Sequence, residues 1–161
     1  IEGSVNSLPF FDKAFDLIIS TSVVYHRRVD ENKAMSEFYR ALKFGGKLIL
    51  ILPAFSCVYG SHDKAVHTRK RYNLAEAVSL VESSGFKLME SRYIFSFLFP
   101  VFLVKRLVEK AFFARKQISD LEILPGFLNL FLFWLCRVEW RLGKLIKFPF
   151  GSSLLIVGEK K

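Results

Sequence analysis

Apolar residues follow two different spacings along the first third of the chain. Residues 15–20 and 47–52 are short, almost entirely apolar runs, which is typical of strands buried on both faces of a parallel sheet. Between these runs, from Asp30, apolar residues recur at helical spacing as far as the pair Gly45-Gly46. This pattern predicts an amphipathic helix that ends at the two glycines. A strand, a helix and a strand in this order predict a right-handed parallel crossover.

The same alternation continues after Pro53, which cannot donate to a sheet ladder and so marks the end of the second strand. Residues 74–84 have helical periodicity and stop at Gly85, and residues 86–94 predict another strand. No crossover helix of the usual kind precedes the last apolar run, residues 153–158, so we place it antiparallel to its neighbours. The predicted fold class is α/β, a partial Rossmann-like doubly wound sheet with an antiparallel last strand.

Two longer apolar stretches, residues 95–108 and 127–142, flank a polar turn at residues 116–126. They predict an inserted helical hairpin whose helices are too short and too interrupted to span a bilayer. Pro100 is expected to break the first stretch. We favour a lid packed on the domain, with contact to a membrane interface or a lipid-like substrate as an addition, because cations follow both stretches. These cations are Lys105, Arg106, Arg137, Arg141, Lys144 and Lys147.

Composition supports one globular unit, since 52% of the 161 residues are hydrophobic. We divide it into residues 1–94, the Rossmann-like core, residues 95–150, the hairpin, and residues 151–161, the last strand. The two cysteines suggest neither a disulfide framework nor a metal site, which fits a reducing cytoplasm. The net charge of +9 favours an anionic membrane surface over nucleic acid, because the basic residues do not interleave with aromatic ones.

Four short motifs occur in a characteristic order in the first third of the chain. They are Leu8-Pro9-Phe10, then Phe15-Asp16-Leu17-Ile18, then His26, then the segment 37–46 that reads Glu-Phe-Tyr-Arg-Ala-Leu-Lys-Phe-Gly-Gly. This order and these gaps resemble the type 11 group of class I S-adenosylmethionine-dependent methyltransferases. Residues 61–63 and 67–72 also resemble a subgroup with a histidine-rich, arginine-tyrosine loop after the fifth strand. The resemblance implies S-adenosylmethionine as the cofactor.

The resemblance also implies a cofactor site that is half built in this chain. The family's glycine-rich loop and the acidic residue that binds the ribose are expected upstream of Ile1. Ser4 stands where the family commonly has an aspartate that faces the adenine amine, and serine accepts a hydrogen bond more weakly. In open α/β sheets, ligands bind outside the carboxyl ends of the strands. We expect Leu8, Pro9 and Phe10 to form an apolar wall against the adenine, with Ser4 beside it. Ser20, Thr21 and Ser22 are expected under the methionine end of the cofactor. Alternatively, Leu8 and Phe10 only fill the core.

Methyl transfer depends chiefly on holding the acceptor at attack distance, and a base is needed only if the acceptor must lose a proton. Candidate bases are His26, His62 and His67, although a packing or capping role is the stronger interpretation for His26. Candidate substrate ligands are Asp63, Arg71 and Tyr72, and a solvated basic loop is the plainer alternative.

Two functions therefore remain open. The first is methyl transfer to a small-molecule or lipid-linked acceptor, with this part of the protein inactive by itself. The second is a noncatalytic, membrane-associated interaction module on the same fold. A nicotinamide-dependent enzyme is a third option, against which the antiparallel last strand argues. We expect a cytoplasmic protein without metal or nucleic-acid partners and with peripheral membrane contact through residues 95–150.

Overall fold

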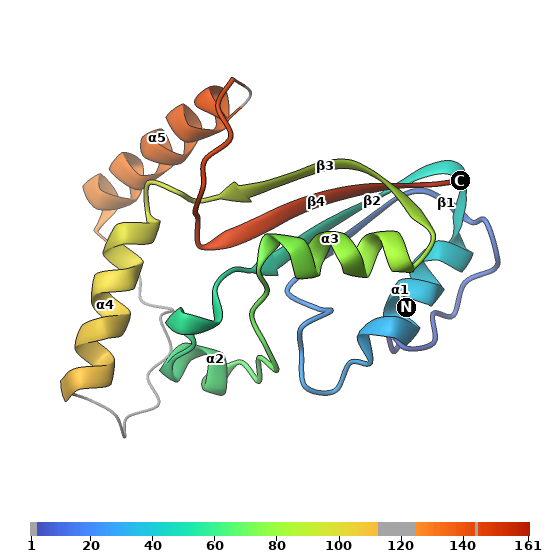
Figure 1. Cartoon of the computed structure of the whole chain (residues 1–161), viewed down its shortest axis with the longest axis horizontal. Helices are drawn as coiled ribbons and strands as arrows, with labels where there is room; N and C mark the ends of the chain where they lie inside the picture. Colours follow the sequence, from blue (N-terminus) through green and yellow to red (C-terminus); the bar gives the residue numbers. More distant parts are fainter. Residues whose placement is uncertain (1–2, 113–124, 144) are drawn as a thin grey trace.

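A four-stranded open sheet forms the centre of the molecule (Figure 1). The computed structural model describes residues 3–112, 125–143 and 145–161. Strand β1 (Phe15–Thr21) is parallel to β2 (Leu42–Pro53), and β4 (Ser153–Lys160) lies antiparallel between β2 and β3 (Phe86–Ile94). The order β1-β2-β4-β3 confirms the predicted α/β class and the antiparallel last strand.

Helices α1 (Glu31–Ala41) and α3 (Leu74–Ser83) lie on the same face of this sheet (Figure 1). Alternate residues of β2, namely Leu48, Leu50 and Leu52, are fully buried in the core cluster. On β1, however, Leu17 and Ile19 are 47% and 59% exposed. The expectation that this strand is buried on both faces is therefore wrong for the described residues, because α1 and α3 both cover the other face.

The end of α1 differs from the prediction. The Asp30 carboxylate caps the helix by accepting hydrogen bonds from the backbone N–H groups of Asn32 and Lys33, as the expected start requires. The helix ends at Ala41, and β2 begins at once with Leu42. Gly45 (φ +74°) and the adjacent Gly46 lie inside β2, where the pairing with β1 shifts register. The glycines thus form an irregularity in the strand, and their assignment as the helix stop is wrong.

The carboxyl end of β2 leads into a short 3₁₀ turn, η1 (Ser56–Val58), and the one-turn helix α2 (Ser61–Ala65). Helix α4 (Phe99–Phe112) follows β3, and α5 (Gly126–Leu142) precedes β4. Pro100 lies in the first turn of α4 and does not break the helix, because a proline there gives up no intrahelical hydrogen bond. The two helices run in different directions from one end of the sheet (Figure 1), and most of the turn predicted between them lies outside the described residues. None of the described helices is long and apolar enough to cross a membrane.

Candidate functional site

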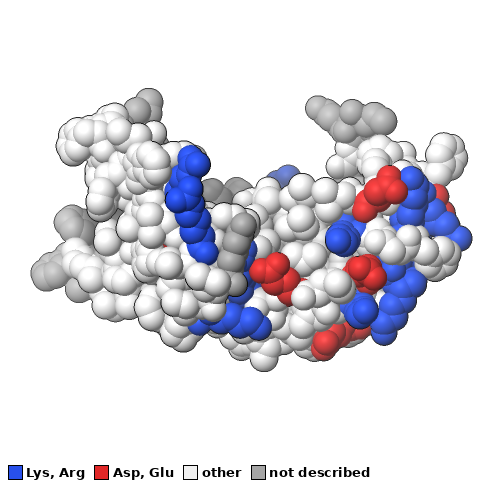
Figure 2. Space-filling model, turned by 90° about the horizontal axis from the view of Figure 1, so that it is seen from above, with Lys and Arg blue, Asp and Glu red and all other residues white. Residues whose placement is uncertain are grey.

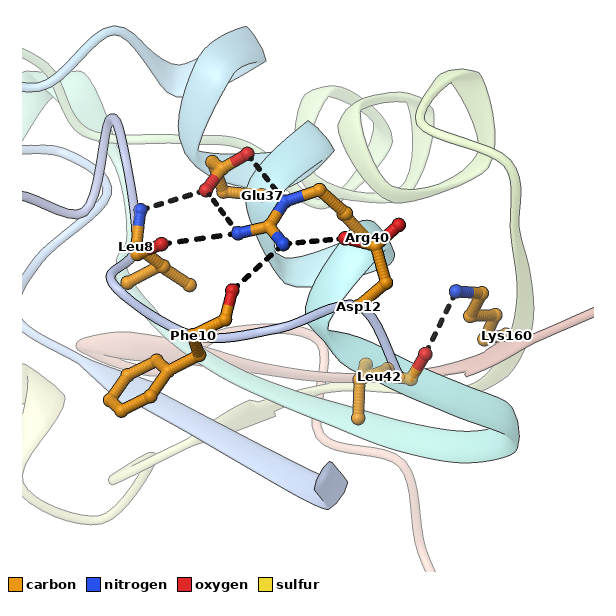
Figure 3. A network of polar contacts seen from close by, with 7 residues as sticks. All are labelled: Leu8, Phe10, Asp12, Glu37, Arg40, Leu42 and Lys160. Atoms are coloured by element: carbon orange, nitrogen blue, oxygen red, sulfur yellow. Dashed lines mark hydrogen bonds and ion pairs between the residues drawn. The ribbon is translucent and has the colours of Figure 1, made fainter. Parts of the chain in front are cut away.

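One turn of α1 holds the main chain of the loop that carries Leu8, Pro9 and Phe10 (Figure 3). The Glu37 carboxylate accepts a hydrogen bond from the Leu8 N–H at 2.7 Å. The Arg40 guanidinium donates to the carbonyl oxygens of Leu8 at 3.1 Å and Phe10 at 2.9 Å. Residues three apart share a helix face, so Glu37 and Arg40 together bind one strip of backbone.

The two charged groups also bind each other. Arg40 Nε and Nη2 lie 3.0 and 2.9 Å from the Glu37 carboxylate, and Nη1 reaches Asp12 at 2.7 Å. The hydrogen bond from Arg40, aided by the Leu8 N–H and opposed by burial, lowers the pKa of Glu37 below its ordinary value. Glu37 and then Asp12 raise the pKa of Arg40 through their hydrogen bonds. Glu37 and Arg40, which together we call the clamp, are therefore both ionised throughout the neutral pH range.

The clamped loop borders an apolar pocket. Leu8 packs against the core, and the Phe10 ring meets Phe15 edge to face with centroids 4.9 Å apart. Such a surface suits a flat, weakly polar ring, and adenine has one. Pro9 is exposed, and Ser4 is exposed with its hydroxyl accepting from the Asn6 N–H at 3.2 Å. The pocket has a volume of about 210 Å³ and is lined by Leu8, Phe10, Phe15, Leu17, Ile18 and Phe38.

Three polar residues stand at the carboxyl end of β1, as topology requires for the site. Ser20 is buried, and its hydroxyl oxygen has no hydrogen-bond partner within the described part of the chain. Thr21 and Ser22 are exposed, and Ser22 has a left-handed backbone (φ +60°). A buried hydroxyl without a partner is costly. A bound polar group could satisfy Ser20, so this end of β1 fits a cofactor with polar substituents.

The structure brings together two of the three candidate histidines. The rings of His26 and His67 meet with centroids 5.8 Å apart. Their segments are joined by backbone hydrogen bonds from Arg27 N–H to the His67 carbonyl and from Arg69 N–H to the Tyr25 carbonyl. His67 is exposed and His26 is half-buried, with Nδ1 accepting from the Arg28 N–H at 3.3 Å. His62 lies separately on α2.

Asp63 and Arg71 form a buried, bidentate ion pair. Arg71 Nε and Nη2 donate to the two Asp63 carboxylate oxygens at 2.9 and 3.1 Å, and Nη1 donates to the Ala54 carbonyl. The second Asp63 oxygen also accepts from the Gly60 N–H. The Phe102 ring of α4 lies 5.4 Å from the Arg71 guanidinium. Both predicted substrate ligands are thus occupied in joining the end of β2 to α2 and α4.

Tyr72, the third predicted substrate ligand, is buried and donates to the Glu31 carboxylate at 2.7 Å. Arg69 and Lys70 form ion pairs with the same carboxylate. Burial and the bond to Glu31 raise the pKa of Tyr72. Burial opposes ionisation of Glu31, but the hydrogen bonds from Tyr72 and Lys70 prevail and lower its pKa. Arg69, Lys70 and Tyr72 therefore all bind Glu31, the first residue of α1.

Sequence reasoning placed Glu37 and Arg40 in a motif but gave them no role, and it missed Asn6. Asn6 joins the same loop to the start of α1 by donating to the Arg28 carbonyl and accepting from the Asp30 N–H. The spacing of Glu37 and Arg40 on the polar side of a helix was the available signal for the clamp. In the described ranges, no group of three or more histidine, cysteine or acidic side chains could hold a metal ion.

Comparison with known proteins points to one family. Residues 1–50 match a family model described as a methyltransferase domain, of type 11. A protein of Encephalitozoon cuniculi named as a putative methyltransferase is 32% identical over 111 residues, which are 56% of this chain and 53% of that protein. The chain thus spans about half the length of this relative.

Solved structures share the fold of nearly the whole chain. A Thermotoga maritima S-adenosylmethionine-dependent methyltransferase, described as a possible histamine N-methyltransferase, has a TM-score of 0.56 at 19% identity, covering 100% of this chain and 63% of that one. Phosphoethanolamine N-methyltransferase 2 of Haemonchus contortus, in complex with S-adenosylmethionine, has a TM-score of 0.54 at 17% identity, covering 98% and 36%. Residues 1–50 thus resemble a methyltransferase domain in sequence, and the chain as a whole shares the fold of these solved methyltransferases.

Proposed function

We propose that the protein containing this chain transfers a methyl group from S-adenosylmethionine to a small-molecule or lipid-linked acceptor. The observation that carries the proposal is the clamp of Glu37 and Arg40 on the main chain of Leu8 and Phe10. It uses an ion pair and three backbone hydrogen bonds to fix the loop that borders an apolar pocket beside β1. Such fixing of a loop is what a preorganised ligand site needs.

The cofactor, when bound, supplies an electrophilic methyl group on its sulfonium. In this proposal, Leu8 and Phe10 bind the adenine ring, and Ser20 gives its free hydrogen-bonding capacity to the polar methionine end. Thr21 and Ser22 lie at the same end of β1 and are available to the same group. Ser4 contributes little to adenine recognition, because its hydroxyl is already used within its own turn.

On the acceptor side, the pair of His26 and His67 is the best candidate for accepting a proton. Both belong to loops that follow the carboxyl ends of β1 and β2, which is where the fold places its ligands. Asp63, Arg71 and Tyr72 are assigned to holding this loop in place, because each already has a charged hydrogen-bond partner within the molecule. His62 stays a third candidate.

Calorimetric titration of the full natural protein with S-adenosylmethionine tests the proposal. We expect binding in the micromolar range, and we expect Phe10→Ala to weaken it about ten-fold, since part of the apolar wall is lost. Phe11→Ala is the matched control, because Phe11 is in the same loop and is 90% exposed. His26→Gln should leave the affinity unchanged and lower kcat.

Absence of binding by the full protein would overturn methyl transfer and favour a noncatalytic interaction module. Binding that Phe10→Ala and Phe11→Ala weaken equally would instead contradict the assignment of the apolar wall.

A further inference from the structure

Within residues 3–112, 125–143 and 145–161, the polar contacts that join helix α5 to the sheet lie in its last turn. The buried carboxylate of Glu139 accepts from the backbone N–H groups of Ser96 and Phe97 at 2.8 and 2.9 Å. Arg92 donates to the Gly143 carbonyl at 2.9 Å, and its guanidinium lies 4.5 Å from the Trp140 ring centroid. These contacts fix the carboxyl end of the helix, so the first half projects from the end of the sheet (Figure 1).

The projecting half presents large apolar side chains to solvent. We call this set the apolar half of α5, and its members are between 52% and 78% exposed. They are Phe127, Leu130, Phe131, Phe133 and Trp134. A soluble domain does not usually leave five large apolar residues together without a partner. Leu145 and Ile146, which follow the carboxyl end of the helix, are also exposed.

Charge distinguishes between the possible partners. Arg137 and Arg141 are exposed on the second half of α5, and Lys147 follows it. The one acidic residue of the helix is Glu139, which is buried and already bonded. Figure 2 shows a largely uncharged surface crossed by a few basic side chains at the end that carries α4 and α5, whereas basic and acidic side chains are mixed toward the other end. The surface therefore complements an apolar layer covered by negative charge.

We infer that α5 docks on an anionic phospholipid bilayer, with its apolar half in the acyl boundary and its arginines among the headgroup phosphates. A helix of 17 residues is about 25 Å long, so its first half reaches about 12 Å. This reach is close to the depth of about 5–10 Å that interfacial helices occupy, if the helix enters at an angle. The inference is independent of methyl transfer, because it needs no cofactor.

Intrinsic fluorescence offers a direct test. The two tryptophans of the sequence, Trp134 and Trp140, both lie on α5. The full natural protein is mixed with vesicles of phosphatidylcholine alone or of equal parts phosphatidylcholine and phosphatidylserine, without S-adenosylmethionine. We expect a blue shift and quenching by bromine-labelled lipid only with the anionic vesicles, and we expect Trp134→Phe to remove most of the signal. Spectra that do not change with either vesicle overturn the inference.

Vesicle co-sedimentation with variants separates the apolar and electrostatic contributions. Phe131→Ser combined with Trp134→Ser should weaken binding at least about ten-fold, and each of Arg137→Gln and Arg141→Gln about five-fold. Phe11→Ser, an exposed phenylalanine away from α5, is the matched control. If Phe11→Ser weakens vesicle binding as much as the double variant does, the apolar half of α5 is not a membrane surface. The same conclusion follows if neither the unmodified protein nor the double variant binds vesicles and the double variant converts a dimer to a monomer. Circular dichroism verifies that each variant is folded.

Discussion

Glu37 and Arg40 show how two residues on one helix turn determine the shape of a distant loop. The Glu37 side chain is mostly buried and accepts from both Leu8 and Arg40. We expect Glu37→Gln to lower the free energy of unfolding by about 1 kcal/mol, because the charge-assisted hydrogen bonds become weaker neutral ones. Urea denaturation measures the change. Glu82→Gln, on an exposed part of α3, is the control and should change it by less than about 0.5 kcal/mol.

The pH dependence of stability should report the same residue. The folded-state pKa of Glu37 lies below the ordinary 4.5. The contribution of Glu37 to the free energy of unfolding is therefore complete above pH 4.5 and is lost as the pH falls through the folded-state pKa. Between about pH 5 and pH 3, the unmodified protein should lose more stability than Glu37→Gln. Parallel curves for the two proteins would contradict the clamp.

The ion pair of Asp63 and Arg71 has a different energetic character, because both side chains are almost completely buried. Asp63→Ala leaves a buried guanidinium without its counter-charge, so we expect a loss of about 3–5 kcal/mol. The double variant Asp63→Leu with Arg71→Met should recover most of that loss, since an apolar pair has no charge to desolvate. Asp16→Ala, which removes an exposed pair with Lys43, is the control and should cost less than about 1 kcal/mol. A small loss in the free energy of unfolding for Asp63→Ala would instead favour Asp63 and Arg71 as substrate ligands.

Sequence motifs located these residues but could not assign their partners. His26 and His67 are 41 positions apart along the chain, and only the pairing of two loops brings their rings together. Arg71 was expected to face a ligand because arginines bind anions well, yet a nearby carboxylate occupies it. Whether an arginine binds a carboxylate of the same chain or a ligand depends on the positions of the two groups in the fold, which the residue type alone does not give.

At the scale of elements, β1 is one of the two edge strands of the sheet. It pairs with β2 on one side, and its open face carries the exposed Leu17 and Ile19. An apolar edge strand is a template for association. We expect the 161-residue chain alone to self-associate in sedimentation velocity experiments, and Ile19→Lys to shift it toward monomer. Ser36→Lys, on the exposed side of α1, adds the same charge as a control. A monomeric chain with one cooperative thermal transition would contradict this expectation.

Periodicity predicted the elements well where it depends on local chemistry. Asp30 and Asn73 each cap a helix with their side chains, and β3 has the bounds that its pattern predicted. The error at Gly45-Gly46 arose because a glycine pair ends a helix as readily as it permits an irregular strand. Pairing with β1 begins already at Leu42, and pairing is a tertiary property.

At the scale of the whole molecule, the chain spans about half the length of its Encephalitozoon cuniculi relative. The activity and acceptor of the whole protein therefore stay proposals, and so do the division into residues 1–94, 95–150 and 151–161, the cytoplasmic location and the contact of residues 95–150 with a membrane. The structure adds a spatial separation. The loop of Leu8 and Phe10 and the apolar half of α5 lie toward opposite ends of the sheet (Figure 1). Ser20, by contrast, stands at the carboxyl end of β1, which is the end of the sheet from which α4 and α5 extend.

The sequence by itself determined the fold class, the places of most helices and strands, and the resemblance to a methyltransferase family, because these depend on local periodicity and on motifs of fixed spacing. Tertiary structure decided which face of β1 is open, which charges bind each other inside the molecule and which apolar side chains of α5 are exposed. The physical reason is that burial and charge pairing are properties of residues far apart in the chain, and only folding brings them within contact distance.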